Sequence, residues 1–144
     1  MKYKFLKLED KKIKSDNGNC IWEIGVWQKP ILNLDICHSG YHCSRTILDA
    51  LSFVSGDVLA EVETKGKSIK QSDKECWEKM RIVKAYHWTK KDSLQLAIFS
   101  AEQVLVNYEN EYPNDDRPRK AIEAAKKVLK NDTKINRAAA DAAA

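Results

Sequence analysis

The apolar residues of this chain change their spacing near residue 90. Between Val58 and Glu63 they alternate with polar residues, as in a half-buried strand. After Lys90 they recur with the period of an amphipathic helix, at Leu94, Ile98, Ala101, Leu105 and Tyr108. The change predicts an α+β protein with a β-rich domain at residues 1–90 and a helical segment at residues 91–144, packed on that domain.

The β-rich part contains several short segments separated by turn residues. Apolar alternation predicts strands at residues 2–8, 20–27, 31–37, 58–63 and 80–88. Asp16-Asn17-Gly18 predicts a tight turn, because Asn and Gly tolerate positive φ angles. Ser44 is expected to cap one short helix, and Ser72-Asp73-Lys74-Glu75 has the form of a capping box for a second. We therefore expect a small mixed or antiparallel sheet with one or two short helices.

The helical segment has clearer boundaries. Thr89-Lys90-Lys91-Asp92 is a capping box that opens the longest apolar stripe in the chain. Asp116 and Pro118 suit the beginning of the next helix, and the alanine-rich end is expected to begin a further short one. The short connection between the two longer helices predicts an antiparallel helical hairpin.

Charge and cysteine content restrict the class of protein. The chain has 25 basic and 21 acidic residues, with lysines densest between Lys2 and Lys14. That run indicates either a solvated face or a nucleic-acid-binding face. No stretch approaches the roughly 20 apolar residues of a membrane span, and no secretory signal is evident. Together with four cysteines, this predicts reduced thiols and a cytoplasmic location, with no membrane partner.

Four potential zinc ligands lie within seven residues, at Cys37, His38, His42 and Cys43. A structural zinc site usually takes two ligands from one knuckle and two from a distant one. No Cys-x-x-Cys pair occurs elsewhere, although Cys20 or Cys76 could complete a site, so we predict no metal. A thiol nucleophile paired with a nearby histidine, His87 included, is a second alternative, but no oxyanion-hole motif accompanies it.

The chain also contains four tryptophans, Trp22, Trp27, Trp77 and Trp88. They favour either packing on a sheet or an aromatic platform for a nucleotide. The candidate ligand-binding residues are Trp22, Trp27, Tyr41, His42 and Ser44. No phosphate-binding loop or hydrolase motif occurs, so we assign no catalytic residue and no cofactor.

Gly40-Tyr41-His42-Cys43-Ser44, followed by an amphipathic helix and a strand, resembles the core of ADP-ribosyltransferase-like folds. The resemblance implies binding of NAD or a related nucleotide, with Tyr41 and Ser44 near the nicotinamide and Glu61 or Glu63 as the carboxylate. The sequence departs from that family, because the first strand offers only lysines where an Arg or His is expected, and because both carboxylates come early.

Two longer resemblances cover most of the chain. Residues 1–90, through Gly40-Tyr41-His42-Cys43-Ser44, Asp57 to Val62 and Trp77 to Ile82, resemble a domain of unknown function in bacteriophage and prophage proteins. Residues 112–125 are similar to a helical motif in immunity proteins of bacterial toxin systems. Arg117 and Arg119 in that motif are candidate partner-binding residues, or they bind carboxylates of the preceding helix.

Our leading hypothesis is a small phage- or prophage-encoded binding protein of the host bacterial cytoplasm. It would be non-catalytic and would inhibit or modulate a bacterial defence or host system. Its partner would be a host bacterial protein or a small nucleotide. The alternatives are an ADP-ribosyltransferase-like protein and a nucleic-acid-binding module.

Overall fold

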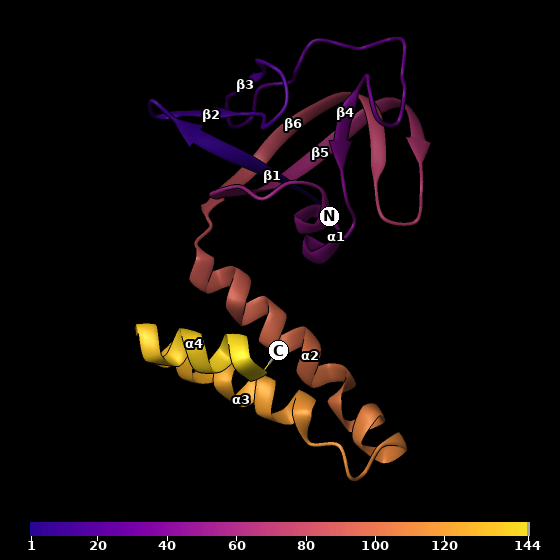
Figure 1. Ribbon diagram of the computed structural model, residues 1–144. Helices are drawn as coiled ribbons and strands as arrows, with labels where there is room; N and C mark the ends of the chain where they lie inside the picture. The colour runs from indigo at the N-terminus through magenta and orange to yellow at the C-terminus, as the bar shows by residue number, and fades with distance from the viewer. Residues whose placement is uncertain (144) are drawn as a thin grey trace. The chain divides into compact units, whose positions relative to one another are not determined.

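The computed structural model describes residues 1–143 and divides into two compact units, which meet between Trp88 and Thr89. The first unit contains β1 (Lys2–Glu9), β2 (Lys12–Lys14), β3 (Ile21–Trp22), β4 (Tyr41–Cys43), α1 (Ile47–Phe53), β5 (Val58–Lys70) and β6 (Glu75–His87). The second contains α2 (Lys90–Glu111), α3 (Arg117–Lys130) and α4 (Lys134–Ala143) (Figure 1). The α+β class is confirmed. None of the helices in residues 1–143 is long and apolar enough to cross a membrane.

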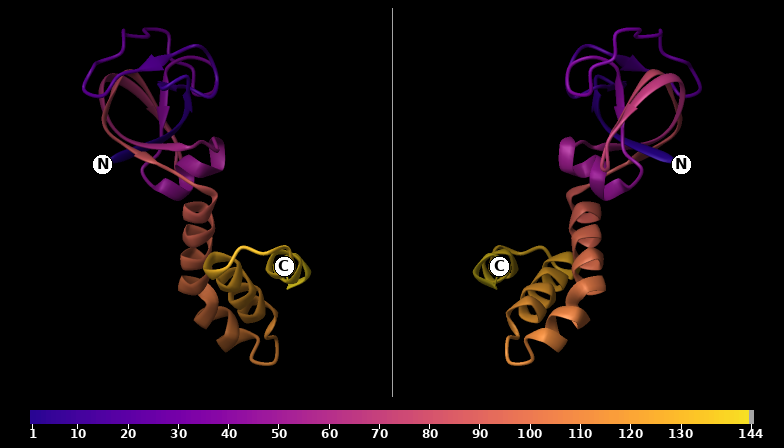
Figure 2. Two further views of the ribbon diagram at one scale, coloured as in Figure 1. Left: turned by 90° about the vertical axis from the view of Figure 1, so that its left-hand side faces the viewer. Right: turned by 90° about the vertical axis from the view of Figure 1, so that its right-hand side faces the viewer.

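The first unit is one antiparallel sheet in the order β3-β2-β1-β5-β6-β4. The sheet curls on itself, as the two views in Figure 2 show. Tyr3 at the start of β1 exchanges two backbone hydrogen bonds with Ser44 just after β4, at 2.8 and 2.9 Å. These bonds join β1 to the last strand of the order, so the sheet encloses its inner face.

Both faces of the central strands are buried. Val58, Ala60 and Val62 face the inner core, as the alternation predicts, and pack there with Leu6, Trp22 and Met80. The outer face of the same strands is covered by α1, where Leu59 and Phe5 pack against Ala50. A strand buried on both faces explains why the sequence of β5 begins with an apolar run.

The predictions for residues 20–37 are wrong in part. Only Ile21–Trp22 forms a strand in the first stretch, because Gly25 adopts a positive φ of 84° and ends the extended run. Ile24 and Val26 beyond it are exposed. Residues 31–37 form a loop instead of a strand, and Ile31 N donates to Glu78 O of β6 at 2.9 Å.

Two further local predictions need correction, and one hairpin was missed. Ser44 does not cap α1, because it is buried in the pairing with Tyr3; Thr46 is the cap. Residues 71–74 form the turn between β5 and β6, and Glu75 already belongs to β6, so the second short helix is absent from the first unit. Polar turn residues serve hairpins as well as helix caps, and here the long flanking strands decide. The hairpin between β1 and β2, through Asp10 and Lys11 at positive φ, was not predicted.

The helical unit agrees more closely with its sequence. Thr89 and Asp92 form the predicted capping box, with Thr89 N donating to Asp92 Oδ2 at 2.8 Å. α2 and α3 form the antiparallel hairpin, with Ile98, Leu105 and Ile122 in its core. The packing of this unit on the sheet stays a prediction.

Candidate functional site

A cavity of about 470 Å³ lies in the first unit. Its walls come from β1, the loop between β2 and β3, the loop that leads into β4, β4 itself, and α1. The chemistry-bearing side chains on its walls include Lys4, Cys20, Tyr41, His42 and Cys43. Its volume falls in the range of small-molecule sites, about 300 to 1,000 Å³.

Lys4 occupies an inward position of β1. It pairs with Ala60 of β5 and alternates with Phe5, so its side chain lies on the same face as the buried Leu6. Its Nζ donates to His42 O at 2.9 Å and lies 5.9 Å from the centre of the Trp22 ring. No carboxylate pairs with it among residues 1–143. Burial lowers the pKa of the Lys4 amine, because the charged form loses hydration.

His42 lies beside Lys4 on the cavity wall. Its Nε2 is buried and has no hydrogen-bond partner among the described residues. Burial lowers the pKa of the His42 imidazole, and the charge of Lys4 adds to that effect. Hydrogen bonds with the backbone of Ile36 and Asp35 oppose it. The lowered pKa favours the neutral imidazole over the charged one.

Three cysteines near Lys4 are unreactive by environment. Burial raises the pKa of the Cys43 thiol to about 12, and it also raises the pKa values of Cys20 and Cys76. The Cys76 thiol donates to Ser39 O at 3.1 Å. A thiol with a raised pKa stays protonated at neutral pH, which makes these groups poor nucleophiles.

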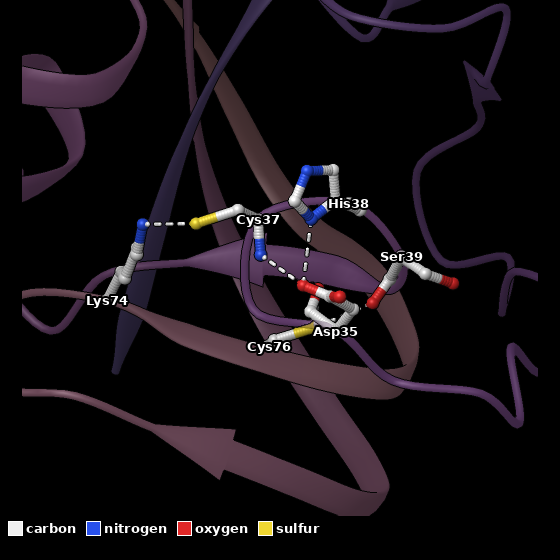
Figure 3. A network of polar contacts seen from close by, with 6 residues as sticks. All are labelled: Asp35, Cys37, His38, Ser39, Lys74 and Cys76. Atoms are coloured by element: carbon white, nitrogen blue, oxygen red, sulfur yellow. Dashed lines mark hydrogen bonds and ion pairs between the residues drawn. The ribbon is translucent and has the colours of Figure 1, made fainter.

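Asp35 organises the loop before β4 (Figure 3). Asp35 Oδ1 accepts from Cys37 N at 3.1 Å and lies 3.0 Å from His38 Nδ1. The exposed Cys37 thiol lies 3.4 Å from Lys74 Nζ. Cys43 instead packs in the inner core. Within residues 1–143, no three His, Cys, Asp or Glu side chains come close enough to hold a metal ion.

The structure brings four of the five predicted ligand residues to the cavity, namely Trp22, Tyr41, His42 and Ser44. Trp22 is a core residue, packed edge-on to Tyr41 at 5.6 Å and donating from Nε1 to Ser15 Oγ at 2.9 Å. Its ring faces are therefore not a free platform for a base. Trp27 lies apart from the cavity, under the Arg81 guanidinium at 4.9 Å.

The carboxylates suggested by the ADP-ribosyltransferase resemblance do not line the cavity. Glu63 Oε2 accepts from Arg81 Nη2 at 2.6 Å, and Glu61 Oε1 accepts from the Tyr86 hydroxyl at 3.2 Å. The structure thus separates them from Tyr41 and Ser44. A transfer reaction that needs all three groups has no assembled site here.

The lysine run between Lys2 and Lys14 does not form one basic surface. Lys2 and Lys14 pair with Glu75 and Glu9, Lys7 pairs with Asp16, and Lys4 points into the cavity. Charges neutralised by the protein's own carboxylates contribute little to phosphate binding. This arrangement weakens the nucleic-acid alternative.

Arg117 and Arg119 are both engaged within the helical unit. Arg117 makes a bidentate contact with Asp115, with Nε to Oδ1 at 2.8 Å and Nη2 to Oδ2 at 2.6 Å. Arg119 makes the same kind of contact with Glu109 of α2, at 2.6 Å for each bond. The second contact ties α3 to α2, which is the structural role that the sequence allowed.

Comparison with known proteins divides the chain at nearly the same point as the structure. Residues 87–144 match the family described as Imm-5 like putative immunity protein, which suggests a binding role of the toxin-immunity type. No curated protein and no solved structure matches the chain. Residues 3–92, more than half of the chain, match the family described as domain of unknown function DUF7666, and the chain therefore belongs to that family.

Proposed function

We propose that this chain is a non-catalytic binding protein of the toxin-immunity type, and that its helical unit contacts a partner protein. The observation that carries the proposal is the match of residues 87–144 to an immunity-protein family. Those residues coincide with a compact unit that begins at Thr89 and has its own core. A unit that folds around its own core can present a surface to a partner.

Helix α2 supplies the proposed contact surface. Phe99, Val104 and Val106 are each more than half exposed, whereas Ile98 and Leu105 are buried in the core of the helical unit. Single exposed apolar residues are ordinary, but Phe99 and Val106 are seven residues apart and therefore lie on one face of α2. There they form the kind of apolar centre that a protein interface buries. Arg117 and Arg119 could bind carboxylates of the partner only by giving up their present contacts with Asp115 and Glu109.

The finer hypothesis concerns the origin of the chain and the identity of the partner. We propose a phage- or prophage-encoded protein that acts in the bacterial cytoplasm on a host or defence protein. In that case the partner is a bacterial protein whose activity falls when the complex forms. A toxin encoded next to this gene is the other outcome, and the experiment below separates the two.

The test is co-expression of the full chain with the product of the adjacent gene, followed by measurement of host growth and of complex formation. An immunity role predicts rescue of growth and co-elution in a fixed stoichiometry. Phe99→Glu should weaken the complex by at least about tenfold, since a charge in the centre of an interface is strongly unfavourable. Ala97→Glu is the control, because Ala97 is exposed on the opposite side of the same helix, and it should leave binding nearly unchanged.

Two results would overturn the proposal. One is rescue without any complex, which would indicate an enzymatic activity. The other is a complex that Phe99→Glu and Ala97→Glu weaken equally, which would place the contact elsewhere. If the adjacent product is harmless and the chain instead raises phage plating on a defended host, the partner is the defence protein.

A further inference from the structure

The position of Lys4 is costly for a purely structural residue. A partly buried ammonium without a carboxylate partner loses hydration and gains little in return. A Leu or Met in the same inward position of β1 would fill the space among Leu6, Trp22 and Cys43 without that cost. A lysine at such a position is therefore a candidate functional group.

Three observations converge on one chemistry. The Lys4 side chain lines a cavity large enough for a small molecule. The Lys4 amine has no carboxylate partner among the described residues, and its Nζ donates to the backbone oxygen of His42 at 2.9 Å. Burial also favours the neutral, nucleophilic form of the amine.

We propose that the cavity admits a small aldehyde or ketone and that Lys4 Nζ condenses with its carbonyl carbon to form an imine. The nitrogen lone pair attacks the carbonyl carbon, and the electrons of the C=O bond move to the oxygen, which takes up a proton that the nitrogen gives up. The carbinolamine then loses its hydroxyl together with the second nitrogen proton as water, and the C=N bond forms. The step needs no oxidant or reductant, and hydrolysis reverses it.

The charge of the walls indicates what else the ligand carries. Among the described lining residues only Asp16 is acidic, and it pairs with Lys7. Lys4 and Lys74 both line the cavity without a carboxylate partner among residues 1–143. A net positive wall favours a carbonyl compound that also bears an acidic group, either a carboxylate or a phosphate.

The experiment uses the full chain and two probes, glyoxylate and pyridoxal 5′-phosphate. Each is incubated with the protein at neutral pH in the presence of cyanoborohydride, which reduces an imine to a stable secondary amine. Peptide mapping by mass spectrometry then locates the label. The two probes distinguish a carboxylate from a phosphate ligand, and pyridoxal without its phosphate tests whether the acidic group matters.

We expect Lys4 to be labelled about tenfold more than Lys12 by at least one probe, because a bound carbonyl has a high local concentration at the amine. Lys12 on β2 is exposed and serves as the internal reference. Lys4→Met should lose the selective label while the other lysines keep theirs. Selectivity should also vanish in urea.

Equal labelling of Lys4 and Lys12 by both probes overturns the proposal. Because that comparison is made within the unmodified chain, it decides the matter even if Lys4→Met fails to fold. If pyridoxal labels Lys4 as strongly as pyridoxal 5′-phosphate does, imine formation at Lys4 stands, but the inference that the ligand carries an acidic group is wrong. The inference does not depend on the immunity role.

Discussion

The buried carboxylate of Glu75 connects three strands of the first unit, and its removal tests how that unit is held together. Glu75 is only 2% exposed, yet it is ionised. It binds Lys2 Nζ of β1 at 2.9 Å, Arg45 Nε just after β4 at 2.8 Å, and Trp77 Nε1 of β6 at 2.8 Å. The perturbation is Glu75→Gln, which keeps the shape of the side chain and removes the charge.

The size of the effect follows from the pKa of this carboxyl. Burial by itself raises the pKa of Glu75, but the hydrogen bonds from Lys2, Arg45 and Trp77 more than offset burial and lower it from 4.5 to about 2. At about 1.36 kcal/mol for each unit of pKa, the ionised form contributes about 3 kcal/mol. The side chain of Arg45 is half-exposed, so solvent screens part of this contribution. We expect Glu75→Gln to lower the free energy of unfolding by about 2 to 3 kcal/mol near pH 7.

The pH dependence has a definite sign. Because the folded pKa lies below the unfolded one, the stabilisation is fully present above about pH 4.5 and is lost as the pH falls through about 2. Urea unfolding should show the difference between wild type and Glu75→Gln falling to about half at pH 3. Glu63→Gln, at a carboxylate that is 51% exposed and paired with Arg81, is the control and should cost less than about 1 kcal/mol. A Glu75→Gln variant as stable as wild type near pH 7 would refute the reasoning.

Three further predictions follow from single residues. Burial lowers the pKa of Lys4 in the folded state, so the unfolded state binds more protons over the pH range between the two pKa values. The free energy of unfolding should therefore rise with pH up to about 10.5. Lys4→Met should flatten that rise in melting curves. A thiol reagent should modify the exposed Cys37 first and the buried Cys43 only after unfolding, as measured by peptide mapping. Leu105→Ala should destabilise the helical unit by about 2 to 5 kcal/mol, whereas Phe99→Ala should change its stability by less than about 0.5 kcal/mol, as followed by circular dichroism at the helix signal.

The sequence predicted those elements whose local signals agree with their packing. The capping box at Thr89 and the alternation in Val58 to Glu63 both have one interpretation, and the structure confirms both. Residues 72–75 have two interpretations, since Ser and Asp begin helices and also form hairpin turns. Only the pairing of β5 with β6, which spans distant residues, selects the turn.

The candidate site was predicted in part for the same reason. Tyr41, His42 and Ser44 stand out as a short motif before a helix, and all three line the cavity. Lys4 was missed because it belongs to a run of lysines, and a lysine run usually indicates a solvated face. Its alternation with Phe5 could have placed it on a defined face of β1, but which face is enclosed depends on the curl of the sheet.

The two proposals concern different units, and that separation makes each of them testable alone. The cavity and Lys4 lie in the unit that matches DUF7666, whereas Phe99 lies in the unit that matches the immunity family. If the units work independently, Lys4→Met should leave the protein complex intact, and Phe99→Glu should leave the labelling of Lys4 intact. If a carbonyl ligand instead regulates the partner, Lys4→Met should change the affinity of the complex, and by reciprocity the partner should change the labelling of Lys4. The pair of crossed measurements therefore decides whether this chain is two joined modules or one coupled protein.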